Sequence, residues 1–254
     1  MSLLLVLIMA GFTGLIAGYV GSLMITKRMA LAGGSLGHLT IPGVTIALIY
    51  GFDVSIGALL FLGLGIFFIW FFKQKSGLSM ELLTAVVFAT SMAIAFLFIS
   101  EEQVIPALIG DTSGLTINHV LITVITSMIV LFVINKIYSK MILINISEDL
   151  AKAERINVSK YNFIYLLCVA ITIALGVRVV GGLMTAAIVA IPAATSKLVS
   201  KNLIVYSYFS AFIGSSACIL GVITANYSGL AGGPLIIIFN GLFFLISLVF
   251  KTSL

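Results

Sequence analysis

Long apolar runs separated by short charged segments dominate this sequence. Only 8% of its 254 residues are charged and 61% are hydrophobic, whereas soluble domains carry about 25% charged residues. Lipid solvates apolar side chains directly, and one membrane-spanning helix needs roughly 20 residues. We therefore predict an all-α, polytopic transmembrane protein with eight or nine spans, in which residues 1–254 form a single domain. The apolar runs fall at about 3–26, 35–50, 54–72, 80–100, 118–138, 161–177, 179–196, 203–225 and 233–250.

The basic residues predict an orientation in the membrane. If all nine runs are spans, twelve of the thirteen Lys and Arg residues share one side and only Arg178 lies on the other. Basic residues gather on the cytoplasmic side, so the N-terminus is expected outside and the C-terminus in the cytoplasm. Asp53, Glu101, Glu102 and Asp111 then lie outside. The net charge of +5 is thus explained by orientation rather than by nucleic-acid binding.

Two features qualify this count of spans. The run at 35–50 reaches only about 24 Å as a helix, short of the ~30 Å hydrocarbon core, and contains Pro42-Gly43, so we expect an interior, broken or re-entrant element. The runs at 161–177 and 179–196 are separated only around Arg178, and their fusion would leave eight spans. Cys168 and Cys218 lie within apolar runs and are expected to be packing residues rather than a disulfide.

The longest hydrophilic stretch, Asn145 to Lys160, predicts a short cytoplasmic helix. Ser147 followed by Glu148 and Asp149 is typical of a helix start, because a serine caps the first turn and acids favour it. The apolar stripe of this helix would contain Leu150, Ala153 (or Ala151) and Ile156. The functional interpretation is a docking surface for a cytoplasmic partner, and the alternative is a solvated connecting loop.

Few polar residues interrupt the spans. An ionisable residue inside a span indicates a functional site, and the neutral imidazole of His38 suits zinc- or manganese-type ions, although it could instead bridge two helices by a hydrogen bond. Asp111 could receive a cation or cap the next helix. His119 is expected at the outer interface, as an anchor or a metal contact.

Glycines form two kinds of pattern. Gly11, Gly14, Gly18 and Gly21 line one face of the first span and predict close helix packing. The segment Gly33-Gly34-Ser35-Leu36-Gly37 matches a G-x-S-x-G nucleophile elbow, but that pattern works only in a strand–turn–helix, so an intramembrane serine protease is only an alternative and no catalytic residue is predicted. The sequence contains no G-x-x-x-x-G-K-[ST] phosphate loop, so a separate subunit would have to hydrolyse ATP.

Two blocks resemble a known family. Residues 27–43, KRMALAGGSLGHLTIPG, are similar to the signature of the permease subunits of metal-ion ABC importers of the zinc/manganese/iron class. Residues 180–183, VGGL, running into 187–195, AIVAIPAAT, match a second block of that family. Residues 108–111, LIGD, are a weaker third match, and DLAKA at 149–153 corresponds to the cytoplasmic coupling segment. The resemblance runs in register from about residue 11 to residue 250.

This resemblance implies a transporter subunit, not an enzyme, with the architecture of a vitamin B12 importer permease. A homodimer in the prokaryotic plasma (inner) membrane would form the pathway for a divalent transition-metal ion, which an extracytoplasmic metal-binding protein delivers. Two cytoplasmic ATPase subunits would bind ATP, and this chain would hold no cofactor. The implied residues are His38 and Asp111 for the pathway and metal, and Glu148, Asp149, Leu150, Ala153 and Arg155 for coupling to the ATPase.

Three positions depart from the family pattern. Gly34 replaces a carboxylate four residues before His38, which would share the helical face of that histidine. Arg155 replaces the glycine that usually closes the coupling helix, and Gly229 stands where an acidic residue is common. With fewer carboxylates, the site could pass the ion weakly, take a different ion or carry a complexed one, so a permease for a metal chelate is the alternative.

Overall fold

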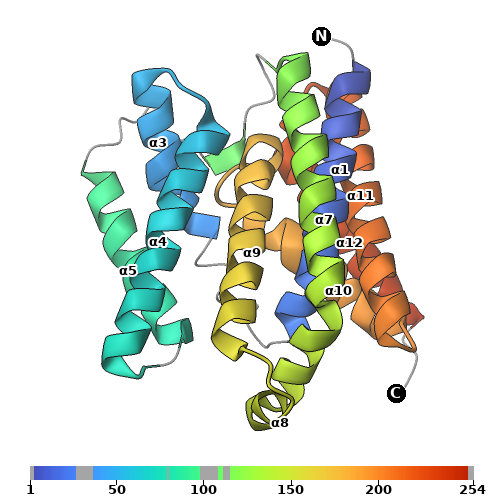
Figure 1. Ribbon diagram of the computed structural model, residues 1–254. Coiled ribbons are helices and arrows are strands. Elements are labelled where there is room, and N and C mark those ends of the chain that lie inside the picture. The colour runs from blue at the N-terminus through green and yellow to red at the C-terminus, as the bar shows by residue number, and fades with distance from the viewer. Residues whose placement is uncertain (1–2, 27–36, 79, 98–107, 111–114, 251–254) are drawn as a thin grey trace.

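The computed structural model describes residues 3–26, 37–78, 80–97, 108–110 and 115–250, and within these ranges the regular structure is helical. Gly33, Gly34, Ser35, Glu101, Glu102 and Asp111 lie outside the described residues. The helices, shown in Figure 1, are α1 (Leu3–Thr26), α3 (Thr40–Tyr50), α4 (Val54–Ser76), α5 (Met80–Phe96), α7 (Ile117–Ile146), α8 (Glu148–Ala153), α9 (Val158–Val180), α10 (Thr185–Val199), α11 (Leu203–Ser228) and α12 (Gly232–Val249).

Every predicted apolar run contains a helix. Six of them (α1, α4, α7, α9, α11 and α12) are long and apolar enough to cross a membrane, and three apolar helices are shorter: α3, residues 82–95 of α5, and α10. The short run at 35–50 gives the eleven-residue α3, as its length predicted. Separate helices form on either side of Gly181, whose positive φ of 81° ends α9, so the runs at 161–177 and 179–196 are two helices rather than one fused span.

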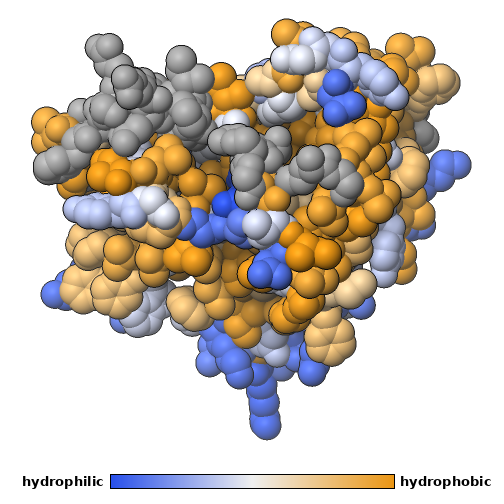
Figure 2. All heavy atoms as spheres, turned by 90° about the horizontal axis from the view of Figure 1, so that it is seen from above, coloured by the Kyte–Doolittle hydropathy of each residue, from blue (hydrophilic) through white to orange (hydrophobic). Residues whose placement is uncertain are grey.

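The helices form a main bundle with a smaller group at its side. Helix α1 packs against α11, α7, α10 and α9, while α3, α4 and α5 pack together and join the bundle mainly through α4 and α9. Figure 1 shows this group on the left, with the two termini at opposite ends and α8 at the end where α7 finishes. Figure 2 views the molecule from the end where α7 begins. Hydrophobic side chains make up most of the outline in this view, as expected of a protein surrounded by lipid.

The glycines of α1 allow the close packing that their spacing predicts. A Cβ atom at Gly14 would overlap the backbone of Gly214 in α11, and one at Gly18 would overlap the backbone of Ser210. The Ser210 hydroxyl donates a 2.6 Å hydrogen bond to the Gly18 carbonyl across this contact. Cys218 is fully buried against the same face and, like the buried Cys168, is a free thiol, which confirms the packing role expected of both cysteines.

Candidate functional site

His38 lies just before α3, beside α5 and close to the start of α10. Its ring is half-buried with its centroid 5.3 Å from that of Phe88 in α5, and no described residue forms a hydrogen bond with the imidazole. The preceding Gly37 packs so tightly on α10 that a Cβ atom there would lie 2.7 Å from the Thr185 hydroxyl oxygen. The Thr40 hydroxyl fixes the turn by donating a 2.6 Å hydrogen bond to the Gly37 carbonyl. The first family-like block therefore meets the second in space.

The third block ends in Asp111. Its preceding residues, Leu108 to Gly110, contact the second block at Gly181. Gly110 has a φ of 85°, and a Cβ atom there would lie 2.6 Å from the backbone nitrogen of Gly181. A Cβ atom on Gly233, at the start of α12, would lie 2.5 Å from the Ile109 carbonyl oxygen. Backbones at this junction touch because glycines from three separate segments leave room. The segments with functional signatures thus converge around the connection from α9 to α10.

A polar cluster at the end where α7 begins joins three helices. Asp53 caps α4, because its Oδ1 accepts hydrogen bonds from the backbone of Ser55 at 2.8 Å and of Ile56 at 3.3 Å. Its other oxygen, Oδ2, accepts from Nη2 of Arg178 in α9 at 2.7 Å and lies 3.1 Å from Nε2 of His119 in α7. One carboxylate therefore binds α4 to α7 and α9, with Arg178 only 12% and Asp53 20% exposed.

The hydrogen bonds of His119 define its role in this cluster. The Thr116 backbone N–H donates to Nδ1 at 3.1 Å, so Nδ1 is an acceptor and Nε2 carries the proton directed at Asp53. Both ring nitrogens are occupied, and the guanidinium of Arg178 repels cations, so the cluster is poorly suited to metal binding. Of the two interpretations of His119, the anchor fits this geometry. More widely, no group of three or more metal-ligating His, Cys, Asp or Glu side chains occurs among the described residues.

Helix α8 confirms that the hydrophilic stretch contains a short helix. The Ser147 hydroxyl caps it by accepting from the Leu150 backbone at 3.2 Å. At the other end, Arg155 has a left-handed φ of 57°, and the backbone N–H groups of Arg155 and Ile156 donate to the carbonyls of Lys152 and Ala151, each at 2.9 Å. This pattern is a Schellman motif, which normally places glycine where Arg155 stands. The departure seen in the sequence is therefore a real backbone constraint.

The two faces of α8 have different surroundings. Ala151 is completely buried, whereas Ala153 is exposed, so Ala151 is the alanine of the buried face. Glu148 and Asp149 are exposed, and Leu150 is 50% exposed. A helix with an apolar side chain and two carboxylates facing outward, attached through a buried alanine, is suited to contact another protein.

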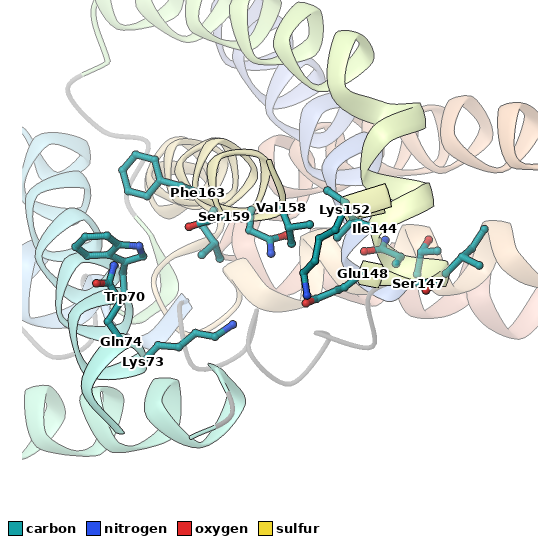
Figure 3. A pocket seen from close by; sticks show the side chains of 15 residues that line it. Trp70, Lys73, Gln74, Ile144, Ser147, Glu148, Lys152, Val158, Ser159 and Phe163 are labelled. Atoms are coloured by element: carbon teal, nitrogen blue, oxygen red, sulfur yellow. The ribbon is translucent and has the colours of Figure 1, made fainter. Parts of the chain in front are cut away.

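A cavity of about 730 Å³ lies between α8 and α4, at the end of the molecule where α7 finishes. Figure 3 shows Trp70 and Lys73 of α4 on one side of it and Glu148 and Lys152 of α8 on the other. Asn145 also lines it, and neither polar atom of its buried amide forms a hydrogen bond within the described ranges. With two ammonium groups against one carboxylate, this cavity does not favour a divalent cation. His38 does not line this cavity.

Comparisons with known proteins agree with this architecture. The chain is 26% identical to the manganese import system permease protein ScaB of Streptococcus gordonii, over 95% of this chain and 88% of that protein. It is 27% identical to the high-affinity zinc uptake system membrane protein ZnuB of Buchnera aphidicola subsp. Baizongia pistaciae, over 91% of each. The structure of PsaBC from Streptococcus pneumoniae in complex with Fab matches it with a TM-score of 0.82 and 26% identity, over 95% of this chain and 89% of the other.

These relatives are permease or membrane proteins of import systems rather than enzymes, which confirms the predicted transporter subunit and its helical permease fold. Residues 2–251 match the ABC 3 transport family, so the match extends across nearly the whole sequence. This chain therefore belongs to the ABC 3 transport family.

Proposed function

We propose that the chain is the permease subunit of an ATP-driven importer for a divalent transition-metal ion, manganese or zinc. The observation that carries the proposal is the family match over residues 2–251, together with relatives named for manganese import and for zinc uptake. The chain supplies the membrane pathway. Because the sequence has no phosphate loop, ATP is bound and hydrolysed by a separate subunit.

His38 is the proposed metal-contacting residue of the pathway. A half-buried imidazole without a hydrogen bond to any described residue can offer a nitrogen lone pair to a passing ion. One such ligand per chain binds weakly, and weak binding suits a pathway because the ion must also leave. A homodimer would place two of these imidazoles in one pathway, which compensates in part for the glycine at position 34. Asp111, next to the junction at Gly110, is the proposed second polar contact.

Helix α8 is the proposed docking site for the ATPase. Its outward residues Glu148, Asp149, Leu150 and Ala153 would contact that subunit, and Arg155 closes the helix behind them. The Schellman motif and buried Ala151 attach α8 firmly between α7 and α9. A displacement of α8 by the ATPase would consequently be passed to both long helices rather than absorbed by a loose connection.

The proposed orientation puts α8 and the C-terminus in the cytoplasm and the N-terminus outside. It rests on the twelve basic residues that the alternation of the nine apolar runs assigns to the same side as α8. Arg178, the exception, is the residue whose charge Asp53 neutralises at 2.7 Å, so its presence on the outer side carries little penalty. An extracytoplasmic metal-binding protein would deliver the ion at that outer end.

Uptake of isotopic manganese, zinc and iron into vesicles that contain the chain with its ATPase tests this function. His38→Ala should reduce ATP-dependent uptake severalfold while the chain still co-purifies with the ATPase. Tyr50→Ala, a change of an exposed ring at the end of α3, the helix that follows His38, is the matched control and should leave uptake unchanged. Uptake of a metal chelate but of none of the free ions would overturn the proposal in favour of the chelate alternative, and normal uptake by His38→Ala would remove His38 from the pathway.

A further inference from the structure

A groove lined by three basic side chains lies beside α8, on the side facing α7 and α9. Its volume is about 590 Å³. Glu154 is its single acidic residue, so the groove carries a net positive charge. Its lining includes Lys140, Leu143, Arg155, Asn157, Lys160 and Tyr161.

None of the cations of this groove has an acidic partner among the described residues. Within the described part of the chain, no carboxylate lies within 4.0 Å of Lys140, Arg155 or Lys160, whereas Lys152 on α8 pairs with Asp149 at 3.3 Å. The Lys140 ammonium is instead positioned by a 2.7 Å hydrogen bond to the Tyr161 hydroxyl and lies 4.9 Å from the centre of that ring. Uncompensated cations in a concave surface favour an anion from outside the chain.

The position of the groove along α7 indicates where that anion comes from. The thirty residues of α7 extend about 45 Å, which exceeds the ~30 Å hydrocarbon core, so Lys140 in its last third lies at the level of the lipid headgroups. Ile129 and Phe132, which are 57% and 70% exposed, share a helix face with Lys136 and Lys140. Exposed apolar residues in a span face lipid, so the groove continues a lipid-facing surface.

Arg155 adds a second argument. A residue with a φ of 57° is ordinarily glycine, because a side chain there costs backbone energy. The arginine at this position lines the groove, and a guanidinium matches the geometry of a phosphate by two parallel hydrogen bonds. The strained position thus contributes to the charge of the groove.

We propose that this groove binds the phosphate headgroup of an anionic lipid of the cytoplasmic leaflet, with Lys140, Arg155 and Lys160 as its cations. The inference rests on the proposed orientation but not on the identity of the transported ion. A lipid held there would contact α7, α9 and the end of α8 at once. The lipid composition of the membrane would then influence the helix that faces the ATPase.

Native mass spectrometry of the delipidated chain, titrated with dioleoylphosphatidylglycerol or dioleoylphosphatidylcholine, tests the proposal. We expect the wild-type chain to prefer phosphatidylglycerol. Each of Lys140→Gln, Arg155→Gly and Lys160→Gln should weaken that binding about fivefold, and the triple variant roughly a hundredfold. Lys201→Gln, an exposed basic residue on the same side but outside the groove, is the matched control and should bind like the wild type.

Three results would overturn the proposal, and none depends on transport. One is an equal loss of lipid binding in Lys201→Gln and in the groove variants, which would indicate general surface charge. Another is displacement of the lipid by inorganic phosphate at comparable concentration, which would indicate a site for free phosphate. The third is unchanged lipid binding in the triple variant together with lost co-purification of the ATPase, which would assign the groove to that subunit. A melting temperature recorded for each variant verifies that it is folded.

Discussion

Replacing Asp53 by alanine should destabilise the protein more than replacing any one of its partners. The change removes the cap of α4, which is worth about 1 kcal/mol. It also leaves the guanidinium of Arg178, only 12% exposed, without its carboxylate. Loss of one partner from a fully buried pair costs about 3–5 kcal/mol, and we take about 2 kcal/mol here because the pair is partly exposed. The sum is about 3 kcal/mol, or a melting temperature lower by roughly 6–12 °C for a chain of this size.

The chain contains its own reporter for this measurement. Cys168 and Cys218 are free and buried, so a thiol-reactive fluorescent dye labels them only as the protein unfolds. Arg178→Met should cost less than Asp53→Ala, because Asp53 still caps α4 and accepts from His119. The double variant should be more stable than the sum of the single effects predicts, by about 1 kcal/mol or more.

A matched control separates this cluster from ordinary surface charge. Asp149→Ala removes the carboxylate of an exposed pair and should leave the melting temperature unchanged within error, since its side chain is almost entirely in solvent. If Asp53→Ala melts with the wild type, or if the two single effects simply add, then the cluster does not hold α4 to α9 and the reasoning is refuted.

Three further predictions concern the backbone and α8. Arg155→Gly should raise the melting temperature by a few degrees, because a side chain on a backbone in the left-handed conformation costs about 1 kcal/mol, which glycine avoids. A lower melting temperature would show that Arg155 does not strain the backbone. Gly181→Ala should lower the yield of folded protein in size-exclusion chromatography, because its Cβ atom would overlap neighbouring backbone, whereas Gly63→Ala has open space and should fold normally; equal yields would argue against the junction. Ala153→Asp should weaken co-purification of the ATPase without lowering the melting temperature, whereas Ala151→Asp should destabilise the chain because it buries a charge; intact co-purification of Ala153→Asp would place the contact elsewhere.

The apolar pattern predicts the helices better than it predicts their ends. The apolar run at 118–138 corresponds to α7, yet α7 continues to Ile146. Backbone hydrogen bonds continue through Lys136, Lys140 and Asn145, because long polar side chains can extend to the interface without breaking a helix. Pro42, in contrast, marks where a helix begins. It lies in the first turn of α3, where its missing N–H costs nothing, so the helix starts close to it.

The cluster around Asp53 could not be derived from the sequence. Asp53 and Arg178 are 125 residues apart, and no motif links them. The distribution of basic residues predicts that Asp53, His119 and Arg178 lie on the same side of the membrane, but a shared side does not show that residues touch. Contact depends on α4 packing against α9, and helix pairing between distant spans is not written in local periodicity.

Helix α9 connects the two ends of the molecule at which these features lie. It begins at Val158, shortly after the left-handed Arg155 that closes the Schellman motif of α8, and it finishes at Val180, beside the glycine junction. Arg178, in its last turn, binds α4 through Asp53. Most of its residues in the spanning window are buried against other helices, so it behaves as a rigid rod rather than a flexible connection. A movement of α8 therefore reaches the junction and the α4 group through one packed helix, and the outer cluster determines how much of that movement α4 follows.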